Sequence, residues 1–320
     1  MLINVCFSMR VQVGAYWRFV VTKTLKNSGL TLIVVTILCL IYWTYLEQQY
    51  AQYLPSTHIM VDGVERKYHI FVPVNPPQKN LSLLVILAGG DAASHLFPQQ
   101  DAFEKLAESE GIVLAFPVGQ RLPHNEGAWQ LNSDETSMQD INFVTAMIND
   151  IVAQNAIDRD RVYAIGYSLG SMFSYELACQ MSDRFAAIAS YAGTMPVIAK
   201  SCAPSRNVPL MHIHALGDGI IAYDKTWNWK AWDSVGRMHD VPGLLNYWKE
   251  RYQCQNSQQS ETETSIHIVY NQCDQRARIE HYGIKSDKEF AAHAWPQMIN
   301  GISTHQVMWS FLRRAADSDR

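Results

Sequence analysis

Residues 162–171 read Val-Tyr-Ala-Ile-Gly-Tyr-Ser-Leu-Gly-Ser, and this stretch decides the fold class. An apolar run typical of a β-strand ends in Gly-x-Ser-x-Gly, and a helical pattern follows from Met172 to Met181. This order is typical of a nucleophile elbow, in which a strained turn presents a serine, here Ser168. Glycine is expected at Gly166 and Gly170 because a β-carbon there would collide with the neighbouring element. The alternative is an ordinary Gly/Ser-rich turn between a strand and a helix.

A nucleophilic serine needs a histidine that accepts its proton and a carboxylate that orients the histidine. With a nucleophile elbow, the chain order is serine, acid, histidine. A buried-strand pattern over Val208–Ala215 runs into Leu-Gly-Asp-Gly, which puts Asp218 just past the carboxyl end of that strand. Open α/β sheets hold functional residues at this edge, so Asp218 is the predicted acid. Asp224 and Asp240 are the alternatives, and an aspartate between glycines is otherwise a common turn former.

His293 is the predicted base because it follows Asp218 in the chain and lies in an irregular segment, Ala-Ala-His-Ala-Trp-Pro. His281 lies in a predicted strand and His305 begins the predicted C-terminal helix, so structural roles fit both better. Three other histidines precede the serine and do not fit the chain order: His58, His69 and His124.

Two backbone amides are expected to bind a developing oxyanion. The amide of Leu169, directly after the nucleophile, supplies one. The other should come from the loop after the early strand Leu83–Leu87, where the sequence continues Ala-Gly-Gly-Asp. Gly90 is the candidate donor and Gly89 shapes the turn, since glycines let the backbone approach a substrate closely. The alternative is a plain tight turn.

The remaining pattern alternates strands and helices, which favours a doubly wound, mostly parallel α/β sheet that opens with antiparallel strands. Strands are predicted near Val64–Val72, Leu83–Leu87, Ile112–Phe116, Arg161–Gly166, Ala186–Ser190, Leu210–Ala215 and Ser265–Tyr270, with Ile279–Tyr282 at an edge. Helices are predicted near Gln99–Glu110, Gln139–Gln154, Ser171–Met181, Val241–Tyr252 and Thr304–Arg314.

From Val64 to Leu312 the chain resembles the secreted esterase family that includes polyhydroxybutyrate depolymerases and feruloyl or acetyl-xylan esterases, a carbohydrate esterase family 1-like group of α/β-hydrolases. The stretches that carry the resemblance are Asp160–Ser171 with Ala178-Cys179, Phe185–Ala189, Cys202 with Val208-Pro209, His214-x-x-x-Asp218 with Tyr223, Trp248–Cys254, Cys273 and His293–Pro296. The resemblance implies an α/β-hydrolase fold with Ser168, Asp218 and His293 in the positions of the catalytic triad.

The chain departs from the family pattern at three places. Leu87-Ala88-Gly89 stands where Leu-His-Gly is usual, which concerns the oxyanion loop. Ala291-Ala292 replaces a pair of glycines before the histidine, and Gly170-Ser171 replaces Gly-Gly after the elbow. None of these changes removes a member of the triad.

The N-terminal region predicts a membrane anchor. Twenty residues from Asn27 to Leu46 carry no charge, and as a helix they would extend about 30 Å, enough to cross a bilayer. Basic residues without acidic ones precede them, which favours a cytoplasmic N-terminus. We expect a cytoplasmic segment over 1–28, a transmembrane signal anchor over 29–46, a linker over 47–57 and a catalytic domain over 58–320. The alternative is a cleaved signal peptide.

Four of the six cysteines fall in the predicted catalytic domain, and four cysteines allow three connectivities. Sequential pairs, Cys179 with Cys202 and Cys254 with Cys273, are expected because each closes a modest loop, as the resembling family does. Such bridges persist in an oxidising compartment. The alternative is buried free thiols.

Charge and histidine spacing exclude some functions. The net charge is −4, and the four basic residues before the apolar run leave −8 for the rest, which argues against a nucleic-acid partner. His212 and His214 share one strand face and could suggest a metal pair. A zinc hydrolase would need a further His/Asp set nearby, and position 216 is leucine, so no metal site is predicted.

Trp227, Trp229 and Trp232 lie between the predicted acid and base, where they pack a long loop or line a hydrophobic acyl pocket. We predict Trp229 and Trp295 as pocket residues. The whole pattern predicts a membrane-anchored, extracytoplasmic serine esterase for polyhydroxyalkanoate, feruloyl, acetyl or related esters, without a cofactor. The alternatives are a peptidase or acyltransferase on the same scaffold, or a catalytically inactive binding module at the cell surface.

Overall fold

The computed structural model describes Leu38 and residues 40–42, 54–90, 97–121, 128–229, 234–286 and 289–317. The chain divides into two compact units, Met1–Tyr53 and Leu54–Arg320. The predicted anchor over 29–46 lies outside the described residues, apart from Leu38 and 40–42, which are helical. Within the described ranges, no helix is both long enough and apolar enough to cross a bilayer.

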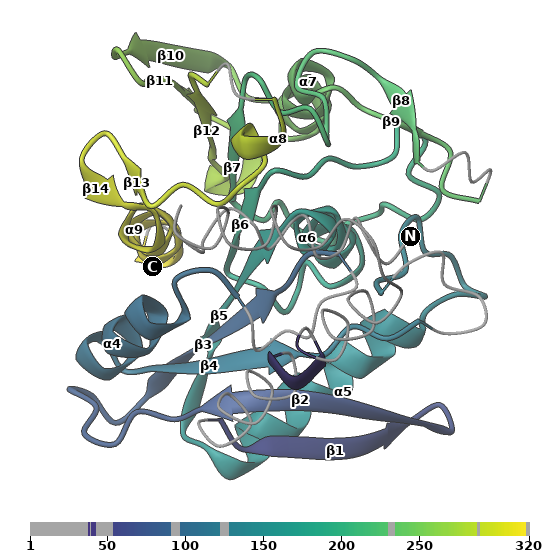
Figure 1. The fold of residues 1–320 in the computed structure, drawn as a ribbon, viewed down its shortest axis with the longest axis vertical. Helices are drawn as coiled ribbons and strands as arrows, with labels where there is room; N and C mark the ends of the chain where they lie inside the picture. The colour runs from purple at the N-terminus through teal and green to yellow at the C-terminus, as the bar shows by residue number, and fades with distance from the viewer. Residues whose placement is uncertain are drawn as a thin grey trace, which may run out of the picture. The chain divides into compact units, whose positions relative to one another are not determined.

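In the second unit, ten strands of the described residues form one sheet (Figure 1). From edge to edge the order is β1 (Ser56–Val61), β2 (Val64–Phe71), β4 (Ile112–Pro117), β3 (Leu81–Leu87), β5 (Ile157–Tyr167), β6 (Ala187–Tyr191), β7 (Leu210–Ala215), β12 (Ile279–Ile284), β11 (Ser265–Asn271) and β10 (Asn256–Glu261). The strands from β4 to β12 are parallel, and antiparallel pairs complete both edges. The predicted doubly wound, mostly parallel sheet is therefore correct.

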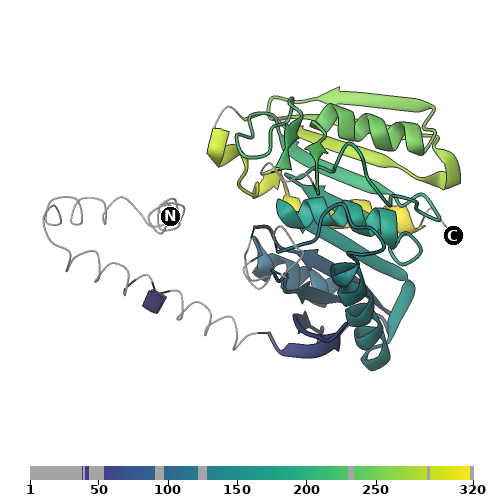
Figure 2. The same cartoon turned by 90° about the vertical axis from the view of Figure 1, so that its right-hand side faces the viewer.

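Helices cover both faces of the sheet. One face carries α5 (Gln139–Gln154), α6 (Leu169–Gln180) and α7 (Val241–Arg251), and the other carries α4 (Gln100–Glu110) and α9 (Thr304–Asp317) (Figures 1 and 2). Every side chain of β3 is buried: Leu83, Val85 and Leu87 enter the core under α5 and α6, whereas Leu84 and Ile86 enter the core under α4 and α9. Burial on both faces explains why β3 reads as a continuous apolar run.

The remaining short elements lie outside the ten-stranded sheet. They are β8 (Trp227–Asn228) paired with β9 (Arg237–Met238), the 3₁₀ turn η4 (Asp274–Arg276), α8 (Glu289–Ala292), and β13 (Met298–Ile299) paired with β14 (Ile302–Ser303).

Three details of the sheet differ from the prediction. The strand predicted at an edge, β12, is interior and pairs in parallel with β7. The edge strand is β10, whose six side chains, Asn-Ser-Gln-Gln-Ser-Glu, are all exposed and so carry no apolar alternation. At the other edge, β1 begins at Ser56, inside the predicted linker 47–57, and its first three residues, Ser-Thr-His, have no apolar side chain that would reveal the start of a strand.

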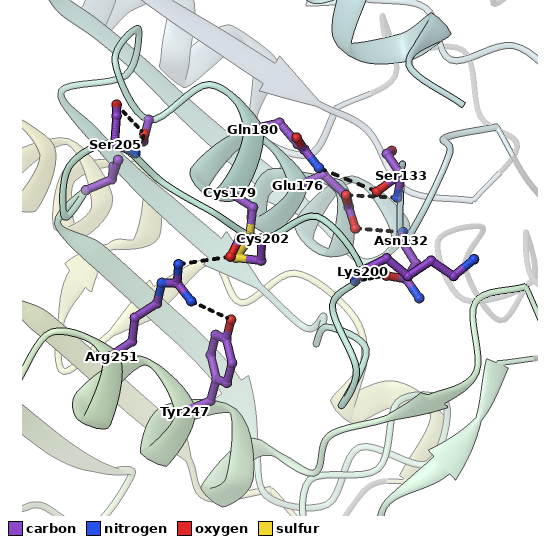
Figure 3. The surroundings of a disulfide bond; sticks show 12 residues. Asn132, Ser133, Glu176, Cys179, Gln180, Lys200, Cys202, Ser205, Tyr247 and Arg251 are labelled. Carbon is purple, nitrogen blue, oxygen red and sulfur yellow. Dashed lines mark hydrogen bonds between the residues drawn. A yellow bond between two sulfur atoms is a disulfide. The ribbon is translucent and has the colours of Figure 1, made fainter. Parts of the chain in front are cut away.

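Both predicted disulfides are formed. Cys179–Cys202 joins α6 to the segment between β6 and β7 (Figure 3), and Cys254–Cys273 closes the base of the β10–β11 hairpin. The guanidinium of Arg251 on α7 donates to the carbonyl oxygen of Cys202 at 2.9 Å, so α7 is tied to the first bridge.

Candidate active site

The nucleophile elbow has the strained geometry that its sequence predicts. Ser168 stands between β5 and α6 with φ 54° and ψ −119°, a conformation that a residue with a β-carbon rarely adopts. A β-carbon at Gly166 would lie 2.3 Å from the carbonyl oxygen of Gly170. One at Gly170 would lie 2.2 Å from the carbonyl oxygen of Leu87, so this glycine allows contact with the end of β3 rather than with β5.

Ser168, Asp218 and His293 come together at the carboxyl ends of β5, β7 and β12. Nε2 of His293 lies 2.9 Å from Oγ of Ser168, and Nδ1 of His293 lies 2.8 Å from Oδ2 of Asp218. A carboxylate can only accept, so Nδ1 carries the proton, and Nε2 is left to accept from the serine hydroxyl. The alternative acids lie elsewhere: Asp224 is exposed, and Asp240 caps α7 by accepting from the amide of Gly243 at 2.8 Å.

The Asp218 carboxylate is fully hydrogen-bonded. Oδ1 accepts from the amides of Ile220 at 2.8 Å and Ile221 at 2.9 Å, and Oδ2 accepts from His293 and from Nε2 of His214, 3.3 Å away. Burial alone would favour the neutral acid. The hydrogen bonds from His214 and His293 outweigh it and hold the pKa of Asp218 well below its ordinary value. The carboxylate therefore keeps its charge.

Two tyrosines that the sequence analysis missed hold the backbone around His293. The hydroxyl of Tyr167 donates to the carbonyl of His293 at 3.1 Å. The hydroxyl of Tyr191 donates to the carbonyls of Ala292 at 3.1 Å and Ala294 at 2.7 Å. Burial raises the pKa of Tyr167 to about 12, so its hydroxyl remains a donor at neutral pH. The available signal was position, because each tyrosine is the last residue of its strand.

The loop after β3 passes directly beside the nucleophile. A β-carbon at Gly89 would lie 2.7 Å from Cβ of Ser168 and 2.9 Å from the carbonyl oxygen of Tyr167. Gly89 is thus required for this close approach, beyond shaping the turn. Gly90 follows with φ 63° and is exposed, and the next residues, 91–96, lie outside the description. Leu169, the other predicted oxyanion donor, is the first residue of α6.

The two predicted pocket tryptophans are mostly buried, each with 7% of its surface exposed. Trp295 packs edge-on against Tyr167 and Tyr191, and its Nε1 donates to Oε1 of Gln99 at 3.1 Å. Trp295 therefore supports the His293 segment from the core. Trp229 belongs to the core on the sheet face that α5, α6 and α7 cover, with its ring 5.5 Å from that of Trp227, and Trp232 lies outside the described residues.

His212 and His214 point into a buried hydrogen-bonded network beside Asp218. Nε2 of His212 and Nδ1 of His214 are 3.2 Å apart, and Nε2 of His214 lies 2.8 Å from the carbonyl oxygen of Ile221. In the part of the chain that the structure describes, no three His, Cys, Asp or Glu side chains form a group able to hold a metal ion.

A family model described as esterase PHB depolymerase matches residues 66–233, more than half of the chain and a range that contains Ser168 and Asp218. The chain belongs to the esterase PHB depolymerase family. His293 lies beyond the matched range, but in the structure it meets the two residues within it.

Relatives of this esterase PHB depolymerase family protein include a bifunctional acetylxylan esterase/xylanase of Neocallimastix patriciarum, 26% identical over 228 residues, which are 68% of this chain and 30% of that protein. Feruloyl esterase B of Thermothelomyces thermophilus is 30% identical over 145 residues, which are 42% of this chain and 45% of that protein. The chain thus spans less than half the length of either relative.

Among solved structures, an acetyl xylan esterase from Aspergillus awamori superposes with a TM-score of 0.54 at 13% identity, over 71% of this chain and 91% of that chain. At this identity the similarity concerns the fold, which is that of the α/β-hydrolase esterases.

Proposed function

We propose that this chain is a serine esterase that hydrolyses carboxylic esters through Ser168, His293 and Asp218. The observation that carries the proposal is the pair of hydrogen-bond distances that link Ser168 to His293 and His293 to Asp218, at 2.9 and 2.8 Å. Family membership independently supports ester hydrolysis as the reaction class.

In the proposed first half-reaction, Oγ of Ser168 attacks the ester carbonyl carbon while Nε2 of His293 takes its proton. Asp218 stabilises the resulting imidazolium. The tetrahedral intermediate collapses, the bond to the alcohol breaks, and His293 returns the proton to the departing alkoxide. The product is an alcohol and an acyl group covalently bound to Ser168.

In the second half-reaction, His293 removes a proton from water, which attacks the acyl carbon. Collapse of the second tetrahedral intermediate releases the carboxylic acid and restores the hydroxyl of Ser168. We assign the oxyanion to the amides of Leu169 and Gly90, with Gly89 providing the close approach of the loop to Ser168. Side chains, backbone amides and water supply every group these steps use.

For the substrate we propose polyhydroxyalkanoate, feruloyl, acetyl or related esters. The names of the relatives, an acetylxylan esterase/xylanase and a feruloyl esterase, favour aromatic or acetyl esters of plant polysaccharides. Trp229 is proposed to border the acyl pocket through its exposed edge. Trp295 would act on the pocket only indirectly, through its packing against Tyr167.

We further propose that residues 29–46 anchor the protein in a membrane, with 1–28 in the cytoplasm, 47–57 as linker and the esterase unit outside. The two disulfides fit an oxidising compartment outside the cytoplasm. Membrane fractionation followed by protease treatment of intact cells tests this. Digestion of the esterase unit from membrane-bound protein is expected, whereas soluble protein that begins after residue 46 would indicate cleavage of a signal peptide.

A panel of nitrophenyl esters and peptide amides, combined with a fluorophosphonate probe, tests the activity. Wild-type protein should hydrolyse the esters faster than the amides, and the probe should label Ser168. Ser168→Ala should lose both ester hydrolysis and labelling by the probe. Faster cleavage of amides than of esters would favour a peptidase. Transfer of the acyl group to added alcohols would favour an acyltransferase, and absence of labelling in folded protein would favour a binding module.

A further inference from the structure

Beneath the proposed triad lies a buried set of polar side chains that the mechanism above does not use. Tyr175 on α6, His212 and His214 on β7, and His281 on β12 each have at most 2% of their surface exposed. The rings of His212 and His281 stack 5.6 Å apart, and Nδ1 of His281 lies 3.0 Å from the carbonyl oxygen of His212. Buried polar groups are costly unless hydrogen-bonded, so the pattern of their bonds is informative.

The acceptors fix the direction of these bonds. Nε2 of His214 faces the carbonyl of Ile221 at 2.8 Å and the carboxylate of Asp218 at 3.3 Å, and because both can only accept, Nε2 carries a proton. Burial, with the neighbouring imidazoles of His214 and His281, holds the pKa of His212 well below its ordinary value, so His212 is neutral and has one N–H. That N–H is best placed on Nε2, donating to Nδ1 of His214 at 3.2 Å.

The other nitrogen of His212 then accepts. Its Nδ1 lies 2.8 Å from the hydroxyl of Tyr175 and 3.1 Å from that of Ser190, both of which can donate. Ser190 also bonds the hydroxyl of Ser171. The donors therefore run from α6 through His212 to His214, whose Nε2 proton faces the carbonyl of Ile221 and the carboxylate of Asp218.

Both ends of this network belong to the site. Tyr175 and Ser171 lie on α6, the helix that begins directly after Ser168, while His214 ends on the carboxylate that orients His293. Oδ1 of Asp218 contacts two amide N–H groups, and Oδ2 contacts the two histidine rings. Any rotation of the carboxylate would therefore weaken at least one of these four contacts.

We infer that His214, held by His212 and Tyr175, is a positioning residue: it fixes the position and orientation of the Asp218 carboxylate, which in turn orients His293. The inference rests on the proposed serine esterase function. His214 touches neither substrate nor the reacting atoms and acts through Asp218. In this role Nε2 of His214 donates, and Nδ1 accepts from His212.

NMR can determine the tautomers of His212 and His214 without a measurement of enzymatic activity. In full-length protein with ¹⁵N-labelled histidine, long-range ¹H–¹⁵N spectra at neutral pH should show His212 and His214 neutral, each with its proton on Nε2. A His214 with protons on both nitrogens, or with its proton on Nδ1, would overturn the inference.

Kinetics test the role. His214→Phe keeps a ring but no donor, and kcat for a nitrophenyl ester should fall roughly 10-fold or more with KM within about twofold, because the interaction matters in the transition state. The acid limb of the profile of kcat/KM against pH should also move, since Asp218 then meets His293 differently. His214→Gln retains an amide donor and should recover most of kcat and the wild-type limb.

Two tyrosine variants form a matched pair. Tyr175→Phe removes the donor to His212 and should lower kcat several-fold, whereas Tyr252→Phe removes a comparable buried bond, to the carbonyl of Val208 at 2.8 Å, and should leave kcat unchanged. An active wild type with unchanged kcat and pH profile in His214→Phe overturns the positioning role alone. A wild type that neither turns over esters nor reacts with a fluorophosphonate overturns the esterase proposal, and the positioning role with it.

Discussion

The hydroxyl of Tyr191 donates to the carbonyl oxygen of Ala294 at 2.7 Å, although 103 positions separate the two residues in the chain. The same hydroxyl bonds the carbonyl of Ala292, so one side chain holds both neighbours of His293. This contact stands where the sequence has Ala291-Ala292 in place of the glycines usual in the resembling family. A rigid attachment from the sheet thus sets the position of the proposed base.

Tyr191→Phe should therefore lower activity more than stability. The phenyl ring keeps the packing against Trp295, while the two carbonyls lose their donor and the His293 segment gains freedom. The two carbonyls share a single hydroxyl proton, so we expect a loss of roughly 1 kcal/mol in all and a fall in kcat of about 5- to 10-fold. Steady-state kinetics and thermal unfolding, measured on the same samples, check this. Unchanged kcat would show that the segment is held by packing alone.

Gly89→Ala should abolish most activity, because the new β-carbon would lie 2.7 Å from Cβ of Ser168 and force the loop or the nucleophile to move. A fall in kcat of about 100-fold is expected, the size of losing an oxyanion donor. Gly63→Ala is the control: its φ is positive, at 77°, so the alanine is strained, but nothing lies within 4 Å of the added carbon. It should cost about 1 kcal/mol of stability and leave kcat unchanged. Equal activity of the two variants would contradict the close approach.

Glu176 should make stability depend on pH. Its carboxylate accepts from the amides of Asn132 at 2.7 Å and Ser133 at 3.2 Å (Figure 3), yet burial raises its pKa from 4.5 to about 7. The folded state therefore binds this proton more tightly than the unfolded state, and the free energy of unfolding should fall as pH rises from about 4.5 to about 7. The fall attributable to this group is about 3 kcal/mol.

Denaturant unfolding of wild type and Glu176→Gln across pH 4 to 8 measures this contribution. As pH rises, the unfolding free energy of Glu176→Gln should increase by about 3 kcal/mol relative to that of wild type. Glu135→Gln changes an exposed carboxylate in the loop that carries Asn132 and Ser133, and its curve of unfolding free energy against pH should be parallel to that of wild type. Parallel curves for Glu176→Gln would mean that the carboxyl titrates alike in both states.

Removing the Cys179–Cys202 bridge with a double alanine variant should lower the free energy of unfolding by about 3 kcal/mol, from the entropy of a loop whose ends are 23 positions apart. The bridge lies near the C-terminal end of α6, whereas Ser168 precedes the N-terminal end, and Glu176 and Lys200 lie beside the bridge (Figure 3). We therefore expect kcat of the folded variant to stay within about twofold of the wild-type value. Denaturant unfolding and ester kinetics check both statements. A large loss of kcat in fully folded protein would link the bridge to the site.

The elements that the sequence predicts are those in which local and global signals agree. The elbow at Ser168 was predictable because the strand, the two glycines and the helix are contiguous, and each excludes most alternatives. The buried parallel strands were predictable because burial on both faces leaves an apolar run. β10 is not predicted, because an edge strand in solvent has no apolar side to reveal it.

The amino-acid sequence alone predicts the fold class and the elbow, because these depend on residues close together or on a shared period. Which loops meet is set by the folded structure. It places Asp218, rather than Asp224 or Asp240, against His293, brings Tyr167 and Tyr191 to the backbone around His293, and places His214 beside Asp218. Such contacts arise when parallel strands distant in the chain end at one edge of a sheet, and no local pattern encodes them.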